Sequence, residues 1–153
     1  MMMGEYQKAV DIAEEYLNSI PCRGNIHYIL ATSYAHLKKF DLALKSVQIA
    51  LDVTSSTEHK ALAGYVHALS GNHIEAHKIA NELIDNYENV PVDLLDIAVI
   101  YTALGDKDKA FEYLDKAFES KFSILFFLKV DPRLKSLHSD PRFEPLLQRL
   151  GLA

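Results

Sequence analysis

Three of the seven histidines lie close together in the sequence, and their spacing is the first feature that could support chemistry. His73 and His77 are four residues apart, so on a helix their imidazoles could share one metal ion. No cysteine nearby completes a ligand set, and the repeat described below places His67 and His77 at positions that packing residues occupy elsewhere. We therefore predict no metal site. His67, His73 and His77 remain the residues that a metal-dependent hydrolase, the least favoured alternative, would use.

Other catalytic patterns are missing from the sequence. Cys22, the single cysteine, lies between Pro21 and Arg23 without a base beside it to activate the thiol. One cysteine also excludes an internal disulfide and fits a reducing compartment. Neither a GxxxxGK[ST] nor a GxGxxG loop occurs, so no phosphate-binding loop is predicted. We expect a protein that is not an enzyme and needs no cofactor.

Charge and hydropathy narrow the class of partner. The 153 residues include 16 basic and 21 acidic side chains, giving a net charge of −5, and no basic stripe is formed. Nucleic acid and anionic membranes are therefore poor partners. The longest apolar run, 124–128, is too short to cross a bilayer, and the N-terminus lacks the pattern of a signal peptide. The sequence predicts a cytoplasmic protein that binds neither membrane nor nucleic acid.

Small residues recur at near-constant intervals along the chain, which indicates an internal repeat. One row has spacings of 34, 33 and 34 and consists of Ala9, Ala43, Ala76 and Ala110. A second row consists of Tyr34, His67 and Tyr101, and a third of Gly71 and Gly105. Because the rows share one register, they predict repeated copies of a single unit.

Each copy has the apolar period of a helix pair, most clearly at 93–120. One stripe consists of Leu94, Ile97, Ala98 and Tyr101, and the next of Ala110, Phe111, Leu114 and Ala117. Between them Gly105 can take the left-handed conformation that ends a helix, and Asp106 can cap the next helix. Gly71 and Asn72 have the same arrangement. The repeat unit is therefore predicted to be a helix–turn–helix.

These residues resemble the tetratricopeptide repeat, a helix–turn–helix unit with small, aromatic and turn positions at fixed places. The last copy matches it at Ala98, Tyr101, Leu104, Gly105, Ala110 and Ala117. The copy at 24–56 matches at Ala31, Tyr34, Ala43 and Ala50, with Lys38 in place of the turn glycine, and the copy at 57–90 is the most degenerate. The resemblance implies an all-α fold, a right-handed α-α superhelix of helix hairpins with C-terminal capping helices.

We divide the chain accordingly. Residues 1–22 would be the second helix of a partial repeat, 23–56, 57–90 and 91–122 three repeats, and 123–153 a capping segment. The partial repeat lacks its first helix, so Val10, Ala13 and Leu17 would miss a neighbour. The sequence leaves open whether this helix continues a longer array, pairs with a second copy in a homo-oligomer, meets a partner, or is simply an open end.

The capping segment has signals of its own. Ile124–Leu128 predicts a short buried helix, and Asp-Pro pairs at 131–132 and 140–141 each predict the start of another. The last helix would bury Phe143, Leu146, Leu147 and Leu150 and end at Gly151. This ending, 131–152, resembles that of bacterial proteins in which tetratricopeptide arrays follow winged-helix, nucleotide-cyclase or kinase domains. The resemblance implies a ligand-sensing regulatory arm of a signalling or transcription protein as an alternative function.

The family resemblance also indicates a binding surface, because such arrays bind peptides along a concave face formed by the first helix of each pair. Carried over position by position, this face holds Asn25, Tyr28, Thr32, His36, Tyr65, Leu95, Val99 and Thr102. The basic clamp that some members use is absent, since those positions hold Tyr28, Thr32, Leu62 and Asp96. The groove would suit an amphipathic helix or extended segment, and the mildly basic tail at 129–149 is an internal candidate. We predict a non-enzymatic scaffold for a protein or peptide whose identity the sequence does not specify.

Overall fold

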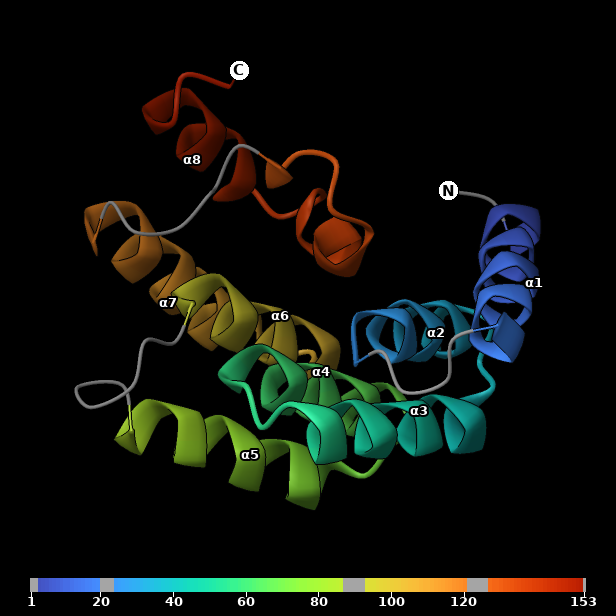
Figure 1. The fold of residues 1–153 in the computed structure, drawn as a ribbon. Helices are drawn as coiled ribbons and strands as arrows, with labels where there is room; N and C mark the ends of the chain where they lie inside the picture. The colour runs from blue at the N-terminus through green and yellow to red at the C-terminus, as the bar shows by residue number, and fades with distance from the viewer. Residues whose placement is uncertain (1–2, 20–23, 87–92, 121–126, 153) are drawn as a thin grey trace.

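The computed structural model describes residues 3–19, 24–86, 93–120 and 127–152, and in these ranges every regular element is a helix (Figure 1). In chain order they are α1 (Met3–Ser19), α2 (Gly24–His36), α3 (Phe40–Val53), α4 (Thr57–Leu69), α5 (His73–Asp85), α6 (Leu94–Leu104), α7 (Lys107–Ser120), the 3₁₀ helix η2 (Pro132–Leu137) and α8 (Phe143–Arg149). The predicted all-α class is confirmed. No helix of the described ranges is long and apolar enough to span a membrane.

Successive helices pack as hairpins, and the hairpins stack in chain order. The pairs α2/α3, α4/α5 and α6/α7 form the hairpins, and α1 packs against α2. The first helix of each hairpin also contacts the next, α2 on α4 and α4 on α6. In Figure 1, α3 and α5 lie on one side of α2, α4 and α6, and residues 127–152 lie on the other side. This stacking agrees with the predicted α-α superhelix.

Small residues allow these helices to approach closely. The alanines of the sequence repeat are fully covered, with an exposed fraction of 0% at Ala43, Ala76 and Ala110. Gly64 lies at a close approach of α4 to α6, because a Cβ built on it would lie 2.8 Å from Cδ1 of Ile100 on α6. The α6 helix is the most enclosed, with buried side chains on nearly every face from Leu94 to Thr102. The core therefore centres on the contact of α4 with α6.

The three turns inside the hairpins have one backbone geometry. In each, a backbone N–H donates to the carbonyl five residues earlier: Lys39 to Tyr34, Asn72 to His67, and Asp106 to Tyr101, at 2.8, 2.9 and 3.0 Å. The residue before each donor has a positive φ, 59° at Lys38, 86° at Gly71 and 80° at Gly105. The predicted left-handed glycines are confirmed, and so are the caps, since Asn72 accepts from Glu75 N and Asp106 from Lys109 N.

The C-terminal helices differ in detail from the prediction. Asp131 accepts a hydrogen bond from Arg133 N and begins a helix as expected, but that helix is of the 3₁₀ type. Asp140 accepts from Arg142 N, yet α8 starts only at Phe143 because the intervening residues form a turn. The helix predicted at Ile124–Leu128 falls largely outside the described residues, as do Pro21 and Cys22.

The N-terminal helix buries two of the three apolar residues that were predicted to miss a neighbour. Val10 and Ala13 are only 2% and 4% exposed, in a helix that packs against α2. The Tyr34 hydroxyl on α2 donates a hydrogen bond to Glu14, which fastens α1 further. The large apolar side chains that this helix leaves open include Met3, Ile12 and Tyr16, at 67%, 59% and 41% exposed. Whether this helix continues a longer array, pairs with a second copy, meets a partner or is an open end stays a prediction.

Candidate binding site

The structure separates the predicted groove residues into an accessible group on α2 and a buried group on α4 and α6. On α2, Asn25 is exposed, whereas Tyr28, Thr32 and His36 are half-buried. The other four lie in the core, with exposed fractions of 8% or less: Tyr65, Leu95, Val99 and Thr102. The role of these eight residues in binding stays a prediction.

The side of α2, α4 and α6 that the C-terminal segment faces is here called the inner face, and residues 127–152 are called the C-terminal segment (Figure 1). The η2 helix packs directly on α6. Leu128, Leu134 and Leu137 anchor the segment, since each is 0% exposed. Part of the face that the sequence predicts to hold a ligand is therefore occupied by the chain itself.

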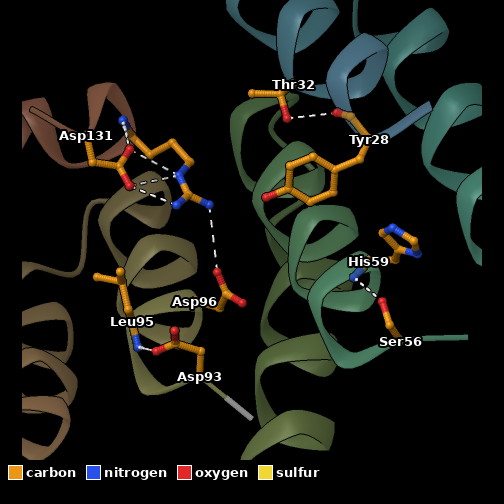
Figure 2. Close-up of polar contacts among 9 residues, drawn as sticks. Tyr28, Thr32, Ser56, His59, Asp93, Leu95, Asp96 and Asp131 are labelled. Atoms are coloured by element: carbon orange, nitrogen blue, oxygen red, sulfur yellow. Dashed lines mark hydrogen bonds and ion pairs between the residues drawn. The ribbon is translucent and has the colours of Figure 1, made fainter. Parts of the chain in front are cut away.

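Arg133 carries the polar part of this contact. Its guanidinium donates to both carboxylate oxygens of Asp131, with Nε 3.1 Å from each and one terminal nitrogen 2.8 Å from Oδ2. The other terminal nitrogen lies 3.7 Å from Oδ1 of Asp96 on α6 (Figure 2). The Arg133 side chain is only 20% exposed. The segment thus inserts a cation between its own carboxylate and one supplied by the helix stack.

Asp96, in the first turn of α6, is unusual because its carboxyl group is largely covered. Its side chain is only 17% exposed, and burial raises its pKa to about 7. Arg133 opposes this rise, whereas the neighbouring charges of Asp93, Glu58 and Asp131 add to it. Burial disfavours the charged form of a carboxyl, so Asp96 changes its charge near neutral pH. The fold holds Asp96 in an environment that only partly compensates its charge.

Tyrosines and histidines from α1, α2 and α4 complete the surroundings of Arg133. Burial raises the pKa of Tyr28 and of Tyr65, and the charge of Arg133 opposes the rise in both. In Figure 2 the Tyr28 hydroxyl points toward the side where Asp96 lies. Tyr6 stacks on His36 with ring centroids 4.3 Å apart, and Nε2 of His36 is buried with no hydrogen-bond partner in the described part of the chain. The inner face is therefore aromatic, with a guanidinium and carboxylates at its centre.

Tyr28 has one contact within its own helix α2 and one with α4. Thr32 donates its hydroxyl to the Tyr28 carbonyl at 2.9 Å, one turn along α2. His59 lies with its ring 5.9 Å from the Tyr28 ring and is itself held by Thr54, whose carbonyl is 2.9 Å from Nδ1. Ser56 caps α4 by accepting from His59 N (Figure 2). These contacts fix Tyr28 at the edge of the inner face.

The histidines singled out from the sequence do not gather into a site. His73 and His77 are both exposed, whereas His67 is half-buried with its pKa lowered by burial. We predicted His77 to be a half-buried packing residue, which was wrong: the α5 surface here faces outward, although the His77 ring lies 6.1 Å from that of Tyr101. Among the described residues, no three His, Cys, Asp or Glu side chains could together hold a metal ion.

Arg133 and Asp131 are the central residues that sequence reasoning missed. Asp131 was interpreted only as a helix cap, and Arg133 only as one charge of a mildly basic tail. A signal was present, because the triplet Asp-Pro-Arg occurs at 131–133 and again at 140–142. In both copies the arginine side chain returns to the aspartate of its own triplet.

Comparison with known proteins supports the repeat only locally. Residues 94–123 match the family model of the tetratricopeptide repeat. No curated protein and no solved structure matches the chain. The matched segment begins with α6, the helix that contains Asp96 and against which η2 packs. Repeats of this kind generally serve as scaffolds for protein–protein interaction and are typically not enzymes.

Proposed function

We propose that this chain is a non-enzymatic scaffold of three tetratricopeptide repeats and a partial fourth, which binds a protein or peptide on its inner face. The observation that supports this proposal is the stack of three hairpins, whose first helices share that face. One of these hairpins matches the repeat family. The accessible part of it lies on α2, where Tyr28, Thr32 and His36 are half-buried and Asn25 is exposed. A tyrosine-rich surface between helices suits an extended or helical peptide.

Substitutions on α2 test this proposal. Tyr28→Glu and Thr32→Glu place a charge on the accessible part of the inner face, whereas charges at Tyr65 or Val99 would disrupt the core. We expect both variants to lose capture of a partner in affinity purification with mass spectrometry, and to keep their helical circular dichroism. Ile74→Glu is the matched control, because Ile74 is 85% exposed on α5. Capture that survives both α2 substitutions would rule out this surface.

A cavity favours a second candidate function, a regulatory arm that senses a small ligand. It measures about 320 Å³, within the range of small-molecule sites. Three helices, α5, α6 and α7, provide its lining, which includes Ile84, Leu94, Ile97, Tyr113, Lys116 and Glu119. Apolar walls with one cation and one carboxylate suit a small amphipathic metabolite.

A thermal-shift screen of metabolites tests the second candidate, because a ligand that binds only the folded state raises the melting temperature. We expect a true ligand of the cavity to lose its shift in Lys116→Ala. The control is Lys78→Ala, since Lys78 also pairs with a glutamate of its own helix but lies outside the cavity. A screen without hits, or hits that both variants affect equally, would rule out the ligand-sensing candidate and leave the scaffold as the remaining proposal.

A further inference from the structure

The C-terminal segment contacts the inner face as a bound peptide would. It approaches as a short η2 turn, places Leu134 and Leu137 into fully buried positions, and inserts Arg133 between them and the acidic part of α6. The body of the protein supplies Asp96 to that contact, and Tyr28 lies beside the pair (Figure 2). Arginine is the side chain best suited to such a place, because its planar guanidinium meets carboxylates and aromatic rings together.

The α-helical end of the segment is fastened separately. Arg142 and Arg149 pair with Asp108 and Asp115 of α7 at 2.7 and 2.6 Å, and their guanidinium carbons lie 4.4 and 4.5 Å from the ring centroids of Phe111 and Phe118. All four of these partners belong to α7. Loss of the Arg133 contact would therefore weaken the attachment of η2 and leave α8 attached to α7.

Asp96 suits a binding role better than a structural one. The Asp131 carboxylate already provides Arg133 with its hydrogen bonds, so Asp96 adds a second, longer contact at 3.7 Å. Holding this carboxyl out of water disfavours its charged form. Residues that lower stability in this way are characteristic of functional surfaces.

Resting on the proposed function, we propose that the inner face carries an arginine-recognition site formed by Asp96 with Tyr28 beside it. Arg133 of the chain's own C-terminal segment occupies this site and inhibits binding. The external ligand is a peptide that presents an arginine beside apolar side chains in a short helical turn, as residues 131–137 do. Because the resident segment is tethered, its local concentration is high, and a free peptide binds only when that segment is weakened.

The test uses the full chain and a fluorescein-labelled peptide with the sequence of residues 129–138, KVDPRLKSLH. Arg133→Glu replaces the cation with a charge that Asp96 and Asp131 repel, and so weakens the hold of η2 while the α8 contacts remain. We expect fluorescence anisotropy to show peptide binding at least about tenfold tighter to Arg133→Glu than to the unmodified chain. Adding Asp96→Asn should reverse most of that gain, and a peptide with alanine for its arginine should bind weakly to every variant.

Arg149→Glu is the matched control, because Arg149 also pairs with an aspartate of the last hairpin but contacts α7 instead of the inner face. It should bind the peptide no better than the unmodified chain. The inference is overturned by equal binding to Arg133→Glu and the unmodified chain, by absent binding to a variant that keeps its helicity, or by binding that ignores the peptide's arginine. If capture of a partner still depends on Tyr28 in those cases, the proposed function stands and only this inference fails.

Discussion

Asp96 illustrates how one side chain can be costly to the fold. Its pKa of about 7 lies well above the ordinary value of 3.8, so the folded state holds the proton more tightly than the unfolded chain does. The contribution of Asp96 to the free energy of unfolding is therefore fully present at low pH. It is lost as pH rises from about 4 to about 7, and it does not change further above that. The difference corresponds to at most about 4 kcal/mol, because each pKa unit amounts to about 1.36 kcal/mol.

Replacing this carboxyl should therefore stabilise the protein at neutral pH. We expect Asp96→Asn to increase the free energy of unfolding by about 1–3 kcal/mol at pH 8 and to change it little at pH 4. Urea titrations of both proteins across that range measure the difference. Asp115→Asn is the control, since Asp115 is 50% exposed and pairs with Arg149 at the surface. A loss of stability at pH 8 would show that the Arg133 contact outweighs the burial of Asp96.

At the scale of the elements, the turns show how much the sequence determines locally. Helix periodicity and the Gly71 and Gly105 signals predicted the hairpins well, because turn conformation depends on nearby residues. Lys38 was interpreted as a departure from the pattern, yet it has a φ of 59° and the same backbone hydrogen bond from the following residue. The stacked helices impose this turn on a residue that disfavours it.

Lys38→Gly should relieve that strain. We expect a gain of about 0.5–1 kcal/mol in the free energy of unfolding, because glycine takes the left-handed conformation readily, although it also adds freedom to the unfolded chain. Lys60→Gly, at an exposed position inside α4, should lose about 1 kcal/mol instead. Thermal or urea unfolding of the pair tests this, and a loss at both positions would argue against strain at Lys38.

The contact of α4 with α6 tolerates little added volume. Gly64→Ala would bring a methyl group within 2.8 Å of Ile100 and 3.1 Å of Ile79, so we expect a loss of about 1–3 kcal/mol. Gly4→Ala on α1 is the control, because a Cβ there meets nothing within 4 Å, and it should be neutral or slightly stabilising. Urea unfolding measures both. An unchanged Gly64→Ala protein would mean that the isoleucine ends move aside at little cost.

At the scale of the whole molecule, local patterns no longer suffice. The sequence indicated that residues 140–150 form an amphipathic helix, and Phe143, Leu146 and Leu147 are indeed buried. The sequence offered the basic tail at 129–149 as an internal candidate for the groove, but not which of its residues make contact, because these contacts join residues far apart in the chain. The pairing of Arg133 with Asp96 is one such contact. For the same reason, Tyr65 and Val99 were expected in an open groove and lie in the core.

A stack in which each hairpin contacts mainly its neighbours should open from its ends. The α6 helix is enclosed by α4, α5, α7 and η2, so its amides should exchange slowest with solvent. Arg142→Ala combined with Arg149→Ala removes the ion pairs and ring contacts that hold α8 on α7. Hydrogen exchange followed by mass spectrometry should then show exchange on the order of tenfold faster in α8, with α2 and α3 unchanged.

The positions at which hydrogen exchange becomes faster decide the outcome, because a general loss of stability and a local release of α8 predict different patterns. If the C-terminal segment is one more layer of the stack, faster exchange stays confined to α8, η2 and the facing helices α6 and α7. Raising the salt concentration in the unmodified protein should reproduce only part of the effect, since salt screens the ion pairs but not the stacking of guanidinium on Phe111 and Phe118. Uniform acceleration from α1 to α8 would instead show that the chain unfolds as a single unit whose end cannot open alone.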